Sequence, residues 1–161
     1  DLETTALCLD ALTQLARVRR FRHILDLGCG TGVLAIAAAK LWRVAITATD
    51  IDPVAVAVAR DNARINREAP FIRAVTADGL VHPAIRTHAP FELIVANILA
   101  GPLTYLAPSL SAALAPGGVT VLSGLLRNQE NLVLSFYRSQ GLVFLRALRD
   151  GPWSALVLKR P

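Results

Sequence analysis

The sequence predicts a doubly wound α/β domain in which a mostly parallel sheet carries helices on both faces and an antiparallel hairpin at its C-terminal end. Strand-like segments alternate with segments of helical periodicity along all 161 residues, and this alternation is typical of right-handed crossovers between parallel strands. A glycine-rich turn follows the first predicted strand, and Asp150-Gly151, a typical hairpin turn, separates the last two. The length fits one domain over residues 1–161.

The first predicted helix covers residues 4–18, because leucines recur every three residues on one stripe of this segment. The apolar run 23–27 ends at a glycine, which predicts a strand followed by a tight turn. The alanine-rich segment 33–41 predicts the second helix.

The β-branched segment 44–49 predicts the second strand, which ends at Asp50. Asp52-Pro53 then opens a helix that runs to about residue 66, since Asp is favoured at the N-cap and Pro at the first helical position. Residues 71–76 predict the third strand.

Residues 79–90 contain one glycine and two prolines, and they are expected to form a loop with at most one turn of helix. The nearly continuous apolar run 91–96 predicts a central strand that is covered on both faces. A helical stripe follows, and Pro116-Gly117-Gly118 is expected to stop that helix. The stripe consists of Leu103, Leu106, Ala107, Leu110 and Leu114.

The end of the chain predicts a short strand, a helix and a hairpin. The strand covers residues 119–122, the helix covers 128–140, and the hairpin strands cover 142–149 and 153–159. The core face expected for this helix consists of Leu132, Val133 and Phe136.

The composition is that of a globular protein, with 53% hydrophobic and 18% charged residues, and it excludes a disordered chain, a collagen-like repeat and a coiled coil. No apolar run reaches the roughly 18 residues of a membrane span, and the start of the chain lacks the basic region of a secretory signal.

Two cysteines without zinc-site spacing predict no disulfide framework and no metal. We expect a cytoplasmic protein without membrane contact, and the missing initial Met indicates a processed or truncated product.

The chain carries 17 Lys and Arg residues against 12 Asp and Glu, a formal net charge of +5. This charge permits an acidic or RNA-rich neighbourhood without requiring one. The densest basic cluster, Arg17-Val-Arg19-Arg20-Phe21-Arg22, is interpreted as a solvated helix end and loop, because no aromatic-rich basic stripe for base stacking accompanies it. Direct nucleic-acid binding is not expected, but it stays open as an alternative.

The segment Asp26-Leu27-Gly28-Cys29-Gly30-Thr31-Gly32 joins the first strand to the next helix. Its glycines allow a tight turn and a close approach of the backbone to a ligand. The spacing G-x-G-x-G differs from the G-x-G-x-x-G of dinucleotide binders, which disfavours a nicotinamide oxidoreductase. Asp50 stands 22 residues after Gly28, at a strand end where a carboxylate can accept hydrogen bonds from both hydroxyls of a ribose. Together these features predict an adenosine ligand that lacks a diphosphate.

These segments resemble class I S-adenosylmethionine-dependent methyltransferases. Residues 26–32 resemble the first motif of that class, and Asp50-Ile51-Asp52-Pro53 resembles the acidic segment that follows it. Four further segments make the chain most similar to the PrmA family, the methyltransferases of large-subunit ribosomal protein L-eleven. They are Thr4-Thr5-Ala6-Leu7-Cys8-Leu9, Gly32-Val33-Leu34-Ala35-Ile36-Ala37-Ala38, Ala96-Asn97-Ile98-Leu99-Ala100 and Leu122-Ser123-Gly124-Leu125-Leu126.

The resemblance implies a seven-stranded Rossmann-like domain, S-adenosylmethionine as cofactor, and methyl transfer to lysine or α-amino nitrogens of a ribosomal protein. It also implies that the family's N-terminal recognition domain is not part of residues 1–161. The chain departs from the family at Leu2, where a His is usual, and at Trp42-Arg43, where a glycine is common. The residues expected to bind the cofactor are Thr5, Asp26, Gly28, Gly30, Gly32, Asp50, Ile51, Asp78 and Asn97.

Asn97, at the end of the central strand, is the predicted catalytic residue. Its amide oxygen can accept a hydrogen bond from an amine and direct the nitrogen lone pair at the sulfonium methyl; alternatively, it only caps a turn. Asp78 either accepts a hydrogen bond from the adenine amino group or forms a turn before Gly79. A packing role is favoured for Cys29. For His82 and His88 a structural role is favoured over that of a catalytic base, and for Trp153 packing is favoured over a wall of the substrate cleft.

Two other functions stay open. One is a class I methyltransferase that acts on RNA or a small molecule, which the high arginine content favours. The other is a non-catalytic module that binds S-adenosylmethionine. Methyl transfer from a sulfonium depends mainly on positioning in a dry site, so the sequence does not need to display an acid–base pair.

Overall fold

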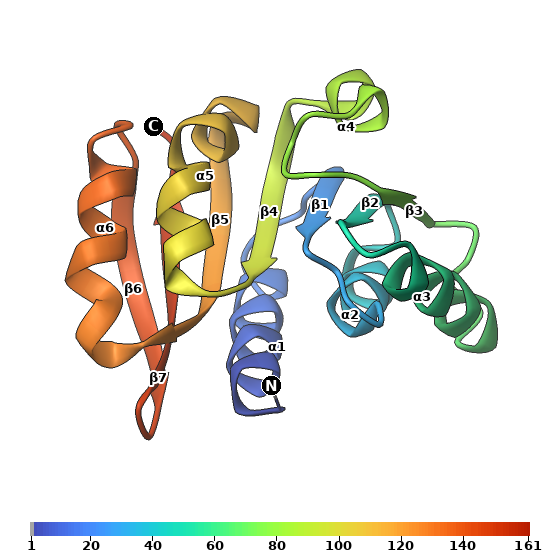
Figure 1. Ribbon diagram of the computed structural model, residues 1–161, viewed down its shortest axis with the longest axis horizontal. Helices are drawn as coiled ribbons and strands as arrows, with labels where there is room; N and C mark the ends of the chain where they lie inside the picture. The colour runs from blue at the N-terminus through green and yellow to red at the C-terminus, as the bar shows by residue number, and fades with distance from the viewer. Residues whose placement is uncertain (1) are drawn as a thin grey trace.

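The sheet of this protein has seven strands in the order β3-β2-β1-β4-β5-β7-β6 (Figure 1). The computed structural model describes residues 2–161. β7 runs antiparallel to both β5 and β6, and the pairs among β1 to β5 are parallel. The fold class predicted from the sequence is therefore confirmed. The strands are β1 His23–Leu27, β2 Ala45–Asp50, β3 Ile72–Thr76, β4 Phe91–Asn97, β5 Leu114–Leu126, β6 Val143–Asp150 and β7 Trp153–Lys159.

Helices cover both faces of the sheet and divide the core into two clusters. Buried side chains of α1, α2 and α3 form one cluster, and those of α4, α5 and α6 form the other. The central strand β4 supplies Leu93 and Val95 to the first cluster and Ile94 and Ala96 to the second, as expected for a strand whose side chains alternate between faces. The helices are α1 Leu2–Ala16, α2 Val33–Trp42, α3 Pro53–Ile65, α4 Pro83–His88, α5 Ala100–Ala113 and α6 Glu130–Arg138, with a 3-10 turn at Arg127–Gln129.

Two helix ends follow from local chemistry. The side chain of Asp52 caps α3, since its Oδ1 accepts the N–H of Val54 at 2.9 Å, and Pro53 occupies the first turn. α2 ends at Arg43, which has a φ of 52° and so occupies the left-handed region that favours glycine. The predicted start of α3 is confirmed, and the departure at Arg43 places a non-glycine residue in a strained C-cap.

The segment after α5 differs from the prediction. α5 ends at Ala113, and β5 runs over residues 114–126 rather than 119–122, so Pro116-Gly117-Gly118 lies within the strand instead of ending the helix. Leu114 is already extended and pairs with Phe91. The next pair is Leu93 with Val119, so the register shifts between the two pairs and the Pro-Gly-Gly residues form an irregular part of β5. Tertiary pairing with β4 therefore overrides the local turn signal.

The segment 79–90, predicted to be mainly loop, contains the short helix α4. Nδ1 of His82 accepts the N–H of Ala84 at 3.0 Å and caps this helix. Nδ1 of His88 lies 2.7 Å from the carbonyl oxygen of Ala84. Both histidines thus have local partners, in agreement with their predicted structural roles.

The core face predicted for α6 is wrong at two of its three positions. Leu132 and Phe136 are 53% and 44% exposed, whereas Val133, Leu134 and Tyr137 are buried. The rotation of the helix follows from tertiary contacts, because the buried hydroxyl of Tyr137 donates to the carbonyl of Leu103 in α5 at 2.7 Å. Periodicity alone could not separate two apolar stripes that lie side by side.

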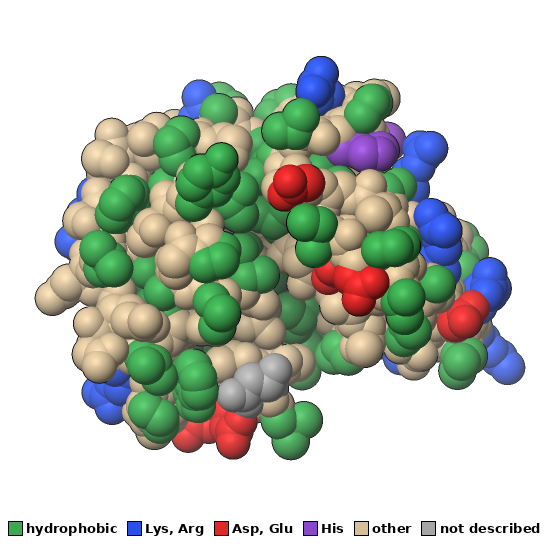
Figure 2. All heavy atoms as spheres, in the orientation of Figure 1, with side chains coloured by type: hydrophobic (Ala, Val, Ile, Leu, Met, Phe, Trp, Pro, Cys, Tyr) green, Lys and Arg blue, Asp and Glu red, His purple; other side chains and the backbone are tan. Residues whose placement is uncertain are grey.

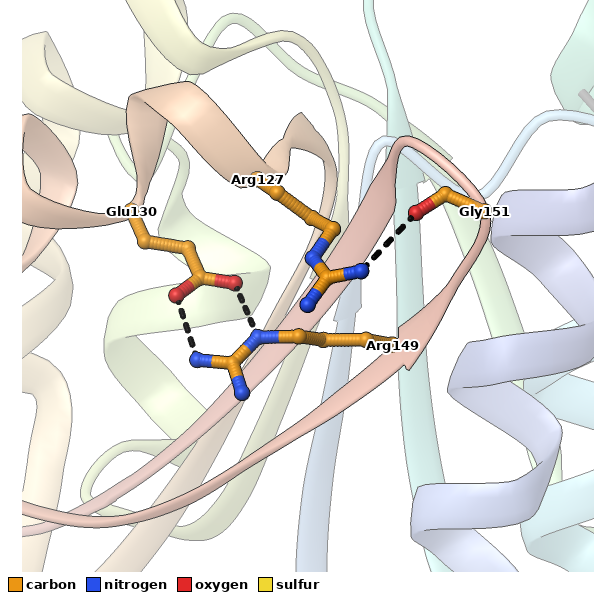
Figure 3. A network of polar contacts seen from close by, with 4 residues as sticks. All are labelled: Arg127, Glu130, Arg149 and Gly151. Carbon is orange, nitrogen blue, oxygen red and sulfur yellow. Dashed lines mark hydrogen bonds and ion pairs between the residues drawn. The ribbon is translucent and has the colours of Figure 1, made fainter.

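A bidentate ion pair also orients the start of α6. Nε and Nη2 of Arg149 donate to the two carboxylate oxygens of Glu130 at 2.8 and 2.7 Å, as Figure 3 shows. The hydrogen bonds from Arg149 hold the pKa of Glu130 below its ordinary value. The nearby Arg127 donates to the carbonyl of Gly151 at the tip of the hairpin. Together these contacts join α6 and the 3-10 turn before it to the β6–β7 hairpin.

Replacing Tyr137 by Phe should lower the free energy of unfolding by about 1–2 kcal/mol, because a buried carbonyl loses a hydrogen-bond donor. Urea unfolding measures this change. Tyr105→Phe is the matched control, since Tyr105 is 84% exposed and its loss should change stability by less than about 0.5 kcal/mol. Equal effects of the two substitutions would contradict the role given to the Tyr137 hydroxyl.

Candidate functional site

Three adjoining cavities lie at the carboxyl ends of the parallel strands. The Asp50 cavity has a volume of about 400 Å³, the glycine-loop cavity about 290 Å³ and the Trp153 cavity about 240 Å³. Gly28 lines both of the first two, and Asn97 lines both of the last two. Ligands of open α/β sheets bind at this edge, so the three cavities form one candidate site.

The glycine loop has the backbone conformation that its residues predict. Gly28, Gly30 and Gly32 have φ angles of 74°, 51° and 89°, values that side chains with a Cβ rarely adopt. A Cβ on Gly28 would lie 2.7 Å from Cγ2 of Ile98. Glycine at position 28 therefore keeps the backbone of the loop close to the segment after β4.

Asp50 fastens this loop to the end of β2. Its Oδ2 accepts the N–H of Gly30 at 2.8 Å, and its Oδ1 accepts the N–H of Asp52 at 3.0 Å. A carboxylate offers about four acceptor positions, so two remain for a ligand. Asp50 is half-buried and lines the cavity named after it, which suits the predicted contact with ribose hydroxyls.

Ile51 and Asp78 lie in the same cavity as Asp50. The Ile51 side chain is 68% exposed and offers an apolar surface to a flat ring. Asp78 is exposed and follows the end of β3, where the N–H of Ala77 donates to the carbonyl of Asp50 at 2.9 Å. The structure thus brings three of the residues expected to bind the cofactor, Asp50, Ile51 and Asp78, to one cavity.

Asp26 and Gly32 do not line any of the three cavities. Gly32 faces α3, and a Cβ on it would lie 3.1 Å from Cβ of Ala59. Asp26 is 2% exposed, and its two carboxylate oxygens have no hydrogen-bond partner among residues 2–161. Any contact of these two residues with a ligand remains a prediction.

Burial raises the pKa of Asp26 to about 7. The backbone N–H of Ala35, near the start of α2, partly offsets this rise in pKa, although it does not form a hydrogen bond with the carboxylate. The negative charge of Asp50 raises the pKa further. Burying an ionised carboxylate without partners is costly. Burial therefore favours the protonated, neutral form of the Asp26 carboxyl group in the folded chain.

Asn97 ends β4 and stands between two cavities. Its Nδ2 donates to Oγ1 of Thr5 at 3.4 Å, across 92 positions of sequence. This contact turns the Asn97 amide so that Oδ1 is buried and has no partner in the described chain. The carbonyl of Thr4 accepts a hydrogen bond from Oγ of Ser123 at 3.1 Å, which anchors the start of α1 on β5. The structure thus brings Thr5 and Asn97 together, and it leaves a buried acceptor oxygen without a partner on a residue that lines two cavities.

Trp153 lines the third cavity, although its sequence context favours a packing role. Trp153 is half-buried and lines this cavity together with Asn97, Leu99 and Gly124. The antiparallel register pairs Trp153 with Leu126, which carries it to the carboxyl end of β5. The hairpin signal at residues 150–151 could have indicated this position, since it determines which end of the last strand meets the site.

Gly124 shapes the same cavity through its backbone. It has a φ of 91°, and a Cβ on it would lie 2.4 Å from the carbonyl oxygen of Ile98. The N–H of Ile98 also donates to the carbonyl of Ser123 at 3.0 Å. No side chain larger than hydrogen fits between these two backbone segments.

Cys29 lies in the glycine loop and is 8% exposed. Burial raises the pKa of its thiol to about 12, so the thiol stays protonated and unreactive.

Within residues 2–161, no group of three His, Cys, Asp or Glu side chains could hold a metal ion. The same residues include no helix that is long and apolar enough to cross a membrane.

Comparison with known proteins gives a consistent result. Residues 1–161 match the family described as Ribosomal protein L11 methyltransferase (PrmA). The ribosomal protein L11 methyltransferase of Brucella suis is 49% identical over 156 residues, which are 97% of this chain and 55% of that protein. The corresponding protein of Chelativorans is 46% identical over 98% of this chain and 54% of its own length. The chain thus spans about half the length of these curated relatives.

A solved structure shares the fold over nearly the whole chain. The crystal structure of ribosomal protein L11 methylase from Lactobacillus delbrueckii subsp. bulgaricus superposes with a TM-score of 0.90 at 31% identity. The match covers 99% of this chain and 79% of that chain. The superposition therefore includes the strand ends that form the three cavities.

The pKa of Asp26 predicts a pH dependence of folding stability. The folded-state value of about 7 lies above the ordinary 3.8, so the folded chain keeps a proton that the unfolded chain releases between these values. The free energy of unfolding should therefore fall as the pH rises from about 4 to about 7. One pKa unit corresponds to about 1.4 kcal/mol, which makes the expected loss a few kcal/mol. Urea unfolding of the unaltered protein and of Asp26→Asn across this window measures the effect.

The Asp26→Asn curve should be flatter than that of the unaltered protein. Asp10→Asn serves as control, because Asp10 is exposed on α1 and its removal should leave the pH dependence almost unchanged. Parallel stability curves for all three proteins would show that Asp26 does not hold a proton in the folded state.

Proposed function

The chain belongs to the ribosomal protein L11 methyltransferase (PrmA) family, and from this premise we propose that it transfers methyl groups from S-adenosylmethionine to amino nitrogens of ribosomal protein L11. The observation that carries the proposal is the unpartnered Oδ1 of Asn97 at the junction of the glycine-loop and Trp153 cavities. An acceptor oxygen at that junction can hold an amine beside a methyl donor. Such a reaction belongs in the cytoplasm, where ribosomal proteins are made.

The residues around the first two cavities fit S-adenosylmethionine. The free acceptor positions of Asp50 suit two ribose hydroxyls, and Ile51 and Asp78 suit the face and the amino group of adenine. Gly28, Gly30 and Thr5 line the glycine-loop cavity, where the methionine part would lie.

The cofactor, when bound, supplies a methyl group that is already activated by its positive sulfur. The protein therefore needs to position the acceptor and to exclude water rather than to activate the donor. Leu99, Trp153 and Gly124 form apolar walls around the third cavity, which suit the aliphatic part of a lysine side chain.

The acceptor amine must lose its proton before it attacks. A free lysine has a pKa near 10.4 and an α-amino group near 7.7–8.0, and transfer into an apolar cavity favours the neutral amine. In the proposed mechanism, Oδ1 of Asn97 accepts a hydrogen bond from the neutral nitrogen and directs its lone pair toward the methyl group. Thr5 keeps the Asn97 amide in this orientation through the Nδ2 contact.

Cofactor binding should depend on Asp50 far more than on Asp52. Asp50→Ala removes two backbone contacts of the loop together with the proposed ribose contacts. Hydrogen bonds to a charged acceptor contribute about 1.5–3 kcal/mol each, so the Kd for S-adenosylhomocysteine should rise about ten- to a hundred-fold or more. Asp52→Ala should lower folding stability by about 1 kcal/mol through the lost cap and leave the Kd nearly unchanged.

Titration calorimetry with S-adenosylhomocysteine and with NAD tests this division of roles. Equal affinity losses for Asp50→Ala and Asp52→Ala would contradict it. Binding of NAD without any response to S-adenosylhomocysteine would overturn the assignment of the cofactor.

Asn97→Ala should separate binding from turnover. A displacement of about 1 Å in a reacting group can cost on the order of a hundred-fold in rate, so single-turnover methyl transfer should slow by about that factor while the Kd of S-adenosylmethionine changes far less. Asn97→Asp keeps acceptor oxygens at the same reach and should retain partial activity. Asn131→Ala, at an exposed position on α6, is the control.

The assay uses labelled S-adenosylmethionine with ribosomal protein L11, and mass mapping of the product. It is run on the chain printed above and on any longer gene product that contains it. Transfer only to RNA or to a small molecule would favour that acceptor class instead. Cofactor binding without transfer to any acceptor would indicate a non-catalytic module, and an unchanged rate for Asn97→Ala would make Asn97 a turn residue.

A further inference from the structure

Basic side chains are concentrated at the edge of the sheet opposite the candidate site. Asp50, Asp52 and Asp78 lie at the carboxyl ends of the strands, around the candidate site. The opposite edge gathers basic residues from segments that are far apart in sequence. These residues, called the amino-edge face below, are Arg17, Arg19, Arg20, Arg22, Arg43, Arg67, Arg86, Lys159 and Arg160.

The topology brings these nine residues to one edge. Parallel strands begin at the same edge, and the segments before β1, β2, β3 and β4 supply seven of the nine. β7 runs antiparallel to β5 and pairs Lys159 with Val119, so its end returns to that edge. Figure 2 shows Lys and Arg side chains along the top and the right margin of the molecule, and others at its left margin and lower left.

Hydrogen bonds connect several segments of this face. Nη2 of Arg19 donates to the carbonyl of Gly117 at 3.1 Å, and the N–H of Gly117 donates to the carbonyl of Arg160 at 2.8 Å. Nε1 of Trp42, beside Arg43, donates to the carbonyl of Arg19 at 3.0 Å. These hydrogen bonds join the segments around Arg19, Arg43 and Arg160 into one connected part of the fold.

The basic groups of this face lack acidic partners. Within residues 2–161, no carboxylate forms an ion pair with any of the nine, and the ion pairs Arg64–Asp61 and Arg149–Glu130 lie outside the set. Two acidic residues lie at this edge. Glu68 is 6% exposed, and Oε1 of Glu92 accepts the backbone N–H of Arg22 at 2.6 Å. Most of the nine are exposed, so their charges are available to an anion.

The shape of the face suits a polymer rather than a single anion. From β3 to β7 the sheet crosses five strand spacings of about 4.8 Å each, which gives a length of roughly 24 Å. Eight of the nine residues are arginines, whose planar guanidinium groups pair with phosphate oxygens in a bidentate manner. The aromatic rings on this edge are occupied, since Arg19 and Arg43 lie over Phe21 and Phe71, and base stacking is therefore not expected.

We propose that the amino-edge face binds the phosphate backbone of a nucleic acid without reading its sequence. This proposal goes beyond the proposed methyl transfer and does not depend on it. The sequence alone isolates the cluster at residues 17–22, whereas the folded chain adds basic residues from four other segments. Because the face and the three cavities lie at opposite edges of the sheet, nucleic acid on one leaves the other accessible.

Fluorescence anisotropy with labelled RNA and DNA strands of about 20 nucleotides tests the proposal. Binding should be micromolar at about 50 mM salt, weaken steeply toward about 200 mM, and be similar for RNA, DNA and unrelated sequences. Two double variants neutralise separate parts of the face: Arg20→Gln with Arg22→Gln, and Arg67→Gln with Arg86→Gln. Each should weaken binding roughly three- to ten-fold and reduce the slope of log Kd against log salt concentration by about 1–2.

Arg127→Gln with Arg146→Gln is the matched control, because it removes the same charge from residues outside the face. Its binding should stay within about two-fold of the unaltered protein, since distant charges act mainly through screened, long-range attraction. The affinity for S-adenosylhomocysteine should be the same in all three variants, which verifies that they are folded.

Three outcomes would overturn the proposal. The first is equal weakening by the control, which would mean that net charge alone drives binding. The second is an effect confined to residues 20 and 22, which would reduce the face to one loop. The third is tighter binding of labelled polyglutamate than of the nucleic acids, which would point to an acidic protein as the partner.

Discussion

The carboxylate of Asp50 is the contact on which the rest of the site depends. One oxygen holds the N–H of Gly30 and the other holds the N–H of Asp52, so a single side chain joins the glycine loop after β1 to the turn after β2. The loop adopts positive φ angles that an unrestrained chain visits only part of the time. Two further hydrogen bonds, from the N–H of Cys29 to the carbonyl of Thr49 at 2.7 Å and from Nδ2 of Asn62 to the carbonyl of Thr31 at 2.8 Å, attach the same loop to β2 and α3.

A second constraint is the close approach of backbones around Ile98. Gly28 on one side and Gly124 on the other leave no room for a Cβ, at 2.7 Å from the Ile98 side chain and 2.4 Å from its carbonyl oxygen. The segment after β4 is therefore clamped between the loop after β1 and the far end of β5. This clamp places Asn97 at the junction of two cavities, where its orientation is completed by Thr5 from α1.

The two edges of the sheet offer different environments to ligands. The carboxyl edge combines carboxylates with a partly apolar cavity beside Trp153, which suits a cationic donor and an aliphatic amine. The amino edge presents arginines that form no ion pair with the carboxylates of residues 2–161. A parallel sheet produces this separation naturally, because strand ends of one kind all gather at one edge. The proposed methyl transfer uses the residues at the carboxyl edge of the sheet. It does not use the basic residues at the amino edge.

The sequence by itself determined those features that depend on neighbouring residues. Continuous apolar runs predicted the central strands, Asp52-Pro53 predicted the start of α3, and the glycine spacing predicted a turn with positive φ angles. The carboxylate of Asp50 was assigned to the site because it directly follows a strand. In the first three cases the responsible residues are neighbours in the sequence, so that local pattern and local structure coincide, whereas the assignment of Asp50 also used its place 22 residues after Gly28.

Only the tertiary structure decided which distant groups meet. Asn97 and Thr5 are 92 positions apart, Trp153 reaches its cavity through the register of an antiparallel pair, and α6 is rotated by the Tyr137 contact with α5. The extension of β5 through Pro116-Gly117-Gly118 likewise depends on its pairing with β4. These outcomes follow from crossovers, strand register and helix rotation. The contacts that stabilise one arrangement over another form only when the whole sheet is assembled, so a local sequence pattern does not contain them.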